Sequence, residues 1–250
     1  MDSSVQNFKL LIEYDGTSYS GWQRQASDRT IQGTIESALH TMTEQSVTLI
    51  GSGRTDAGVH AVAQVANFHV ETRLAPDVFL RGLNGLLPGD IVIRDCLQAA
   101  EGFHARYDAR SKVYEYRILN HPIRPALFRQ YAWHISTSLD LEAIKTAMGH
   151  LKGEQDFSAF QAAGGNQAHA VRTVMNLRLS DKDAEGYVVF SIEADGFLRH
   201  MVRNVVGTLV DVGLGKTSPT GFKDILLWRD RSKAGITAPA RGLFLMEVKY

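Results

Sequence analysis

The residues best suited to chemistry stand in one short segment, 51–60, which reads Gly-Ser-Gly-Arg-Thr-Asp-Ala-Gly-Val-His. Arg54, Thr55 and Asp56 place a cation, a hydroxyl and a carboxylate side by side. The glycines predict a loop with positive φ angles or a close approach to another molecule. A carboxylate presented on such a loop can serve as a nucleophile. Asp56 can equally bond to neighbouring backbone amides as an ordinary turn residue, so the segment alone leaves both interpretations open.

Three other patterns that suggest ligand chemistry fail on spacing. Residues 213–217 end like a phosphate-binding P-loop, but that motif needs glycine where Val210 stands. Asp56 occupies the position at which a dinucleotide-binding fingerprint starting at Gly51 needs glycine. The nine histidines and the single cysteine, Cys96, show no metal-ligand spacing. We therefore expect no nucleotide cofactor and no metal.

The composition is that of a soluble globular protein, with 44% hydrophobic and 22% charged residues in 250. No apolar run approaches the roughly 20 residues that span a bilayer, and residues 1–7 lack a signal-peptide pattern. A single cysteine cannot form an intrachain disulfide. We expect a protein without a membrane segment in the reducing cytoplasm.

The charges balance, 27 basic against 27 acidic side chains, so a nucleic-acid interface would have to be a local feature. Residues 106–129 concentrate cations and interleave them with aromatic side chains. This segment is either a face for RNA or a solvated strand surface. The cations are Arg106, Arg110, Lys112, Arg117, Arg124 and Arg129, and the aromatic residues are Tyr107, Tyr114, Tyr116 and Phe128.

The elements that must position the 51–60 loop follow from hydrophobic periodicity. Helices are predicted at 31–42, capped by Asp28 or Thr30, and at 76–86. The order strand, helix, strand, strand, helix, strand is that of a ferredoxin-like unit. The predicted strands and apolar runs are 8–14, 47–50, 62–70 and 91–97.

The second half repeats this order loosely. Helices are predicted at 139–151, with Thr137-x-x-Asp140 as a capping box, and at 197–212, followed by a short helix after Ser218. The predicted strands are 112–119, 171–179, 187–194 and 243–248.

A boundary near residues 105–110 divides the predicted chain into an N-terminal half, 1–107, and a C-terminal half, 108–250. The expected class is α/β (α+β), with two ferredoxin-like or RRM-like halves whose antiparallel sheets meet around a central active-site cleft.

Residues 53–60 resemble the signature loop of the tRNA pseudouridine synthase A (TruA) family, and further motifs of that pattern follow in order along nearly the whole chain. Together they are far more specific than one loop. The motifs are Glu-Tyr-Asp-Gly at 13–16, Gly-Trp-Gln-Arg-Gln at 21–25, Asn84, Leu-Pro-Gly-Asp-Ile at 87–91, Phe-His-Ala-Arg at 103–106, Tyr-Glu-Tyr-Arg at 114–117, Asp-Phe at 156–157 and His-Met-Val-Arg-Asn at 200–204.

The resemblance implies an isomerase that converts uridine to pseudouridine in the anticodon stem–loop of tRNA, at positions 38, 39 and 40. It also implies a homodimer with the RNA lying across both subunits. The reaction breaks and remakes one bond to the ribose without redox chemistry, so no cofactor is expected. The site must supply a nucleophile, a pocket for a flipped base and exclusion of water.

The resemblance assigns Asp56 as the nucleophile, Arg203 as its ion-pair partner and Tyr114 as the ring that stacks on uracil. A guanidinium keeps a carboxylate ionised in a closed pocket and orients it through two hydrogen bonds. An aromatic ring can hold an unstacked base. Arg54 is expected to clamp the RNA backbone or help to open the stem.

From the residues alone, plainer interpretations stay open. Arg203 could be an exposed helix cation on the same face as Arg199, Tyr114 an ordinary core tyrosine, and Arg54 part of a pair that stabilises the loop. His60 has no assigned role and is expected to be structural.

Two other function classes compete with the synthase. A non-catalytic RNA-binding module could use similar sheets with aromatic strands. A hydrolase using Asp56 would need a second carboxylate, which no recognisable spacing supplies.

Overall fold

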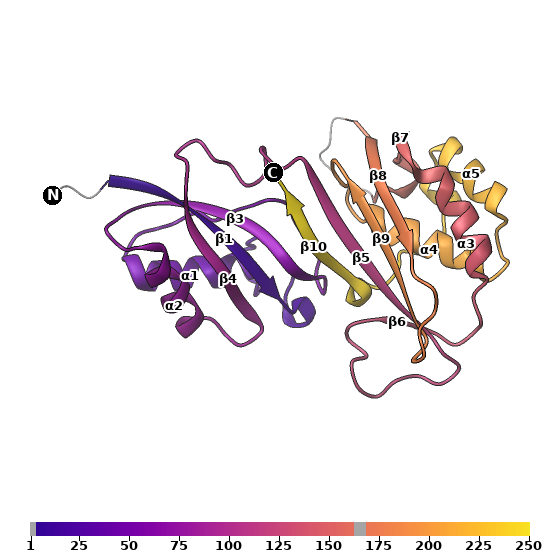
Figure 1. Cartoon of the computed structure of the whole chain (residues 1–250), viewed down its shortest axis with the longest axis horizontal. Helices are drawn as coiled ribbons and strands as arrows, with labels where there is room; N and C mark the ends of the chain where they lie inside the picture. Colours follow the sequence, from indigo (N-terminus) through magenta and orange to yellow (C-terminus); the bar gives the residue numbers. More distant parts are fainter. Residues whose placement is uncertain (1–3, 163–168) are drawn as a thin grey trace. The chain divides into compact units, whose positions relative to one another are not determined.

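The computed structural model describes residues 4–162 and 169–250 (Figure 1). The chain forms two compact units, Met1–Arg110 with Leu245–Tyr250 and Ser111–Phe244. Both units combine helices with mostly antiparallel strands, which confirms the predicted α/β class. Within the described residues no helix has the length and apolar character to cross a membrane.

The first unit has the predicted ferredoxin-like order. Its strands run β4-β1-β3, with β2 beside β3, and all of these pairs are antiparallel. The end of the chain adds Leu245–Lys249 of β10 (Leu243–Lys249) next to β3. The other elements are β1 (Ser4–Tyr14), α1 (Ile31–Thr43), β2 (Ile50–Gly51), β3 (His60–Thr72), α2 (Pro76–Leu86) and β4 (Ile91–Ala99).

Alternation along β1 builds the core of this unit. Every second residue from Phe8 to Tyr14 is at most 3% exposed, as expected for a strand with one covered face. The ring of Phe8 packs on Phe68 of β3 and Phe79 of α2, with centroids 5.4 and 4.7 Å apart. Of the two predicted caps of α1, Thr30 is the one used: its hydroxyl accepts from the Gly33 amide.

The second unit has an antiparallel sheet in the order β5-β9-β8-β7, with the short β6 parallel to β5. The predicted hairpin at 171–179 and 187–194 is confirmed with the same bounds. The elements are β5 (Ser111–Asn120), β6 (Trp133–Ile135), α3 (Leu141–Met148), β7 (Gly153–Asp156), β8 (Val171–Leu179), β9 (Tyr187–Ala194), α4 (Met201–Gly213) and α5 (Pro219–Trp228).

Two helix starts in this unit differ from the prediction. The capping box at Thr137 is wrong, because Asp140 is the N-cap and accepts from the Ala143 amide at 2.9 Å. The Thr137 carbonyl instead accepts from the side chain of Asn120 at 2.7 Å, which holds it outside the helix. Helix α4 begins at Met201 rather than at 197, because His200 has a left-handed backbone with φ 60°.

Candidate active site

The 51–60 segment is a loop between β2 and β3 whose first part rests on buried Gln64. The Ser52 hydroxyl donates to Gln64 Oε1 at 2.6 Å, and Gln64 Nε2 donates to the Gly53 carbonyl at 3.0 Å. The Ser52 amide also donates to the Val65 carbonyl at 2.8 Å. These bonds fix the loop to β3 immediately before the predicted functional residues.

Thr55 is held from two sides by residues distant in the sequence. The hydroxyls of Tyr14 and Thr55 are 2.8 Å apart, and the Trp22 amide donates to the Thr55 carbonyl at 3.0 Å. Burial raises the pKa of Tyr14, so its phenol is neutral. Tyr14 and Trp22 belong to two of the sequence motifs quoted above, so the motifs converge on one loop.

Asp56 is half-buried and opens a turn, in which its carbonyl accepts from the Val59 amide at 3.1 Å. Gly58 in this turn has φ 76°, which favours glycine. Gly21 has φ 93° and lies against the loop backbone; a Cβ there would meet the Thr55 carbonyl oxygen at 2.7 Å. Only glycine at 21 allows this approach.

His60 closes the loop at the start of β3. Its ring is 2% exposed, and Nδ1 lies 3.0 Å from Asp15 Oδ1 and 3.2 Å from the Gly16 amide. The Gly16 amide donates to Nδ1, and the Asp15 carboxylate beside this nitrogen also accepts from Thr17. The ring therefore ties the end of the loop to the turn after β1.

Arg54 has an exposed side chain on this loop. Its Nε donates to Gln23 Oε1 at 3.0 Å. Arg54 and Asp56 thus stand two positions apart on one loop of the first unit.

Tyr114 lies in β5 of the second unit, opposite Ile192 of β9. It is 7% exposed, and its ring meets the ring of Phe197 edge-on with centroids 4.9 Å apart. Tyr116, two residues further on, is fully buried on the same face of the strand.

Arg203 lies in the first turns of α4 and is half-buried. Its Nε donates to the Ala238 carbonyl at 2.8 Å, and the Tyr116 hydroxyl donates to the next carbonyl, Pro239, at 2.7 Å. Burial raises the pKa of Tyr116, opposed by the nearby charges of Arg203 and Arg241. Arg199 precedes the helix, so an exposed pair of cations on one helix face is not what the chain forms.

Asn204 organises the segment that holds Arg203, and sequence reasoning assigned it no role. It is fully buried, its Nδ2 donates to the Phe160 carbonyl at 2.8 Å, and its Oδ1 accepts from Thr237 Oγ1 at 2.6 Å and from Arg231 Nη2 at 3.1 Å. These bonds hold residues 231–237 beside α4, directly before the carbonyl that binds Arg203. The signal available in the sequence was the place of Asn204 in the motif at 200–204.

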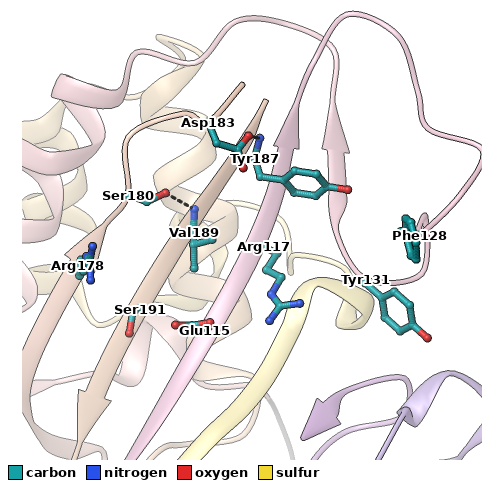
Figure 2. A pocket seen from close by; sticks show the side chains of 10 residues that line it. All are labelled: Glu115, Arg117, Phe128, Tyr131, Arg178, Ser180, Asp183, Tyr187, Val189 and Ser191. Atoms are coloured by element: carbon teal, nitrogen blue, oxygen red, sulfur yellow. Dashed lines mark hydrogen bonds between the residues drawn. The ribbon is translucent and has the colours of Figure 1, made fainter. Parts of the chain in front are cut away.

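A pocket of about 630 Å³ opens beside β5 (Figure 2). Because side chains alternate along a strand, the pocket is on the opposite face of β5 from Tyr114. Glu115 and Arg117 line it because they alternate with Tyr114 and Tyr116 along the strand. Its other lining residues come from β8, β9, the hairpin between them and the segment after β5: Phe128, Tyr131, Arg178, Ser180, Asp183, Tyr187, Val189 and Ser191. None of the four predicted site residues lines this pocket.

The fold is that of a mixed α/β protein that carries Arg54 and Asp56 on one loop of its first unit, and comparison with known proteins identifies its family. The model of the tRNA pseudouridine synthase family matches residues 10–108 and 147–250. Over 246 residues, the chain is 44% identical to tRNA pseudouridine synthase A of Thermoanaerobacter sp. (strain X514) and 46% identical to that of Acetivibrio thermocellus. Each match covers 98% of this chain and 100% of the relative. The chain belongs to the tRNA pseudouridine synthase family, which confirms the predicted class, an isomerase acting on tRNA uridine.

Among solved structures, the chain resembles one described as a Cbf5-Nop10-Gar1 complex, with 13% identity and a TM-score of 0.37. The match covers 99% of this chain and 58% of that chain. A likeness of this size carries no structural argument.

Proposed function

We propose that this chain converts uridine to pseudouridine in the anticodon stem–loop of tRNA, at positions 38, 39 and 40. The observation that carries the proposal is the Asp56 loop, which lies inside the segment 10–108 that the family model matches. The loop around Asp56 is bonded to β1 through the Thr55 hydroxyl, and its backbone is bonded to β3 and to the segment before α1. This arrangement suits a carboxylate held in place for a reaction.

In the proposed reaction Asp56 is the nucleophile: its carboxylate forms a bond to the ribose or to the base, and this bond breaks again before the product leaves, unless Asp56 instead assists a glycal route. The bond between N1 of uracil and C1′ of the ribose breaks, the base turns in the site, and a new bond joins C5 of uracil to C1′. A proton leaves C5 and N1 gains one, so the product has the same atoms as the substrate. The chain's own task is to hold the flipped base and to exclude water while it is detached.

Arg203 is proposed as the ion-pair partner of Asp56. Its Nε is directed by the Ala238 carbonyl, which orients the planar guanidinium. A guanidinium so oriented can bind a carboxylate through two hydrogen bonds and keep it ionised when water is excluded. Tyr114 is proposed to stack on the uracil, since an aromatic ring edge-packed by Phe197 is a rigid surface for an unstacked base.

Arg54 is proposed to bind the RNA backbone, because its side chain is exposed on the same loop as Asp56. The proposed halves are residues 1–107, which carry Asp56, and 108–250, which carry Tyr114 and Arg203. We further propose a cytoplasmic homodimer with the tRNA across both subunits. Light scattering of the purified chain tests the dimer.

The decisive experiment incubates the purified chain with unmodified tRNA and maps pseudouridine by chemical labelling and reverse transcription. Modification at positions 38, 39 and 40 is the expected result. Modification elsewhere would exclude the anticodon stem–loop as the target. Binding of tRNA without any pseudouridine would leave the non-catalytic RNA-binding module as the function.

A further inference from the structure

A series of hydrogen-bonded side chains leads from a buried carboxylate to Arg54. Its members are Glu36, Gln32, Gln23 and Arg54. Glu36 of α1 is 6% exposed, and its Oε1 accepts from the Leu49 amide at 2.9 Å and from Gln32 Nε2 at 3.0 Å. Its Oε2 lies 3.2 Å from Nη1 of Arg24, in an ionic contact without a directed hydrogen bond. Leu49 leads into β2, so α1 is bonded directly to the strand that enters the loop.

Their hydrogen-bond partners determine how the side-chain amides of Gln32 and Gln23 are oriented. Gln32 Nε2 faces the Leu49 carbonyl and the Glu36 carboxylate, which can only accept. Gln32 Oε1 must then point the other way, where it accepts from the Arg24 amide and from Gln23 Nε2, both at 2.8 Å. Gln23 therefore presents its Oε1 to Arg54 Nε, at 3.0 Å.

The Arg54 guanidinium is engaged at one of its three nitrogens. Nε is engaged by Gln23, and in the described part of the chain the two terminal nitrogens of Arg54 form no hydrogen bond or ion pair. The exposed end of the guanidinium thus keeps four N–H groups in one plane. Such an edge matches two oxygens of a phosphate, and a lysine could not reproduce it.

We propose that Gln23 is a positioning residue that orients Arg54 for a bidentate contact with an RNA phosphate, with Gln32 and Glu36 fixing the direction of Gln23. The inference rests on the proposed function, because it takes Arg54 to contact the RNA. It assigns to α1 a part in substrate binding through Gln32 and Glu36, which are themselves buried.

The segment around Gln23 does not depend on the Gln23 side chain for its fold. The backbone around it is bonded independently, through Trp22 to Thr55 and through the Gln32 amide to the Trp22 carbonyl. Gln25, two residues further on, provides a matched control: its exposed amide donates to the Ser20 carbonyl and takes no part in the hydrogen bonds that lead to Arg54.

The test is a double-mutant cycle on tRNA affinity, with Gln23→Leu, Arg54→Ala and the double variant, and Gln25→Leu as the control. Gln23→Leu should weaken binding of unmodified tRNA about tenfold, the size expected when a bond to a charged group is lost. Gln23→Leu added to Arg54→Ala should change the affinity less than twofold, because its effect acts through Arg54. Gln25→Leu should bind like the wild type.

In turnover, Gln23→Leu should raise KM and leave kcat within about twofold, as expected for a binding contact that is made before and during the reaction. Equal losses from Gln23→Leu with and without Arg54 would overturn the proposal, as would wild-type affinity of the single variant. Thermal unfolding checks the fold, and Gln23→Met replaces the leucine variant if that one is unfolded. The binding measurement does not depend on turnover. If the wild type makes no pseudouridine, the proposed function is excluded, but the double-mutant cycle on affinity still tests the role of Gln23.

Discussion

The hydroxyl of Tyr14 lies 2.8 Å from the hydroxyl of Thr55, so β1 holds the residue directly before Asp56. Both side chains are buried, at 3% and 7% exposure. The two residues are 41 positions apart in the chain, and their contact makes the placement of Asp56 depend on the core of the first unit.

Tyr14→Phe should therefore cost stability as well as activity. It leaves the buried Thr55 hydroxyl without this partner, which should lower the free energy of unfolding by about 1–3 kcal/mol. The double variant Tyr14→Phe/Thr55→Val removes both polar groups and should be no less stable than the single one. Urea unfolding measures the cycle, and strict additivity of the two single effects would contradict a direct bond.

Much of the first unit was predictable because the secondary structure that its local sequence pattern favours is also the one that its tertiary packing requires. The alternation of β1 and the capping hydroxyl of Thr30 each indicate the observed structure. The hairpin of β8 and β9 was predictable for the same reason. By contrast, β6 has three residues and β7 reads Gly-Glu-Gln-Asp, so neither carries a periodic signal.

Which residues form the candidate site could be predicted better than the contacts that hold them in place. Glycines around Arg54 and Asp56 predicted a loop, but nothing local indicates that Gly21 lies against the Thr55 carbonyl or that Gln64 bonds to Ser52. Such contacts join distant parts of the chain and exist only once β1 and β3 have paired. The cap at Asp140 failed to be predicted for a similar reason, because Asn120 takes the Thr137 carbonyl.

Tyr114 is expected to act through its ring. Tyr114→Phe keeps the stacking surface and should keep most tRNA affinity, whereas Tyr114→Leu should lose about 1–3 kcal/mol of binding. Tyr116→Phe is the control, because it removes the bond to the Pro239 carbonyl from a fully buried ring on the same strand. That variant should lose stability rather than affinity. Equal binding by Tyr114→Leu and the wild type would return Tyr114 to an ordinary core role.

Affinity for tRNA should fall steeply with salt in spite of zero net charge, because each phosphate contact releases counterions. Arg124 and Arg129 are exposed in the segment after β5. Replacing both with Gln should reduce the slope of log affinity against log salt by about 1–2. Arg81→Gln on α2, where Arg81 pairs with Asp77, should leave the slope unchanged. A flat plot for the wild type would remove the argument for a basic RNA-binding face.

The proposed role of Arg203 in turnover requires the planar guanidinium group and not only its positive charge. Arg203→Lys keeps the charge but loses the bond from Nε to the Ala238 carbonyl and any bidentate contact with Asp56. Turnover should fall by an amount equivalent to about 1.5–3 kcal/mol, with Arg203→Ala at least as poor. The control is Arg178→Lys, an exposed arginine on β8. A folded Arg203→Ala protein with wild-type turnover would exclude the proposed ion pair.

The assignment of Asp56 separates an enzyme from a binding module. Asp56→Asn is nearly isosteric, and the bonds that hold the loop come from its backbone and from Ser52, Thr55 and Gln64. The fold and most of the tRNA affinity should therefore survive. Conversion of uridine should fall to background, since among the described residues Ser52 bonds to Gln64 and Thr55 to Tyr14, and neither partner is a base that would activate a hydroxyl.

A turn residue would behave differently, because asparagine is as good as aspartate in most turns and activity would be kept. Circular dichroism, tRNA binding and pseudouridine yield on the same Asp56→Asn sample distinguish the two cases. Asp28→Asn, in an exposed position before α1, is the control for loss of one negative charge and should leave the yield unchanged. Substantial turnover by a folded Asp56→Asn protein would remove Asp56 from the reaction, and the non-catalytic RNA-binding module would then account better for the chain.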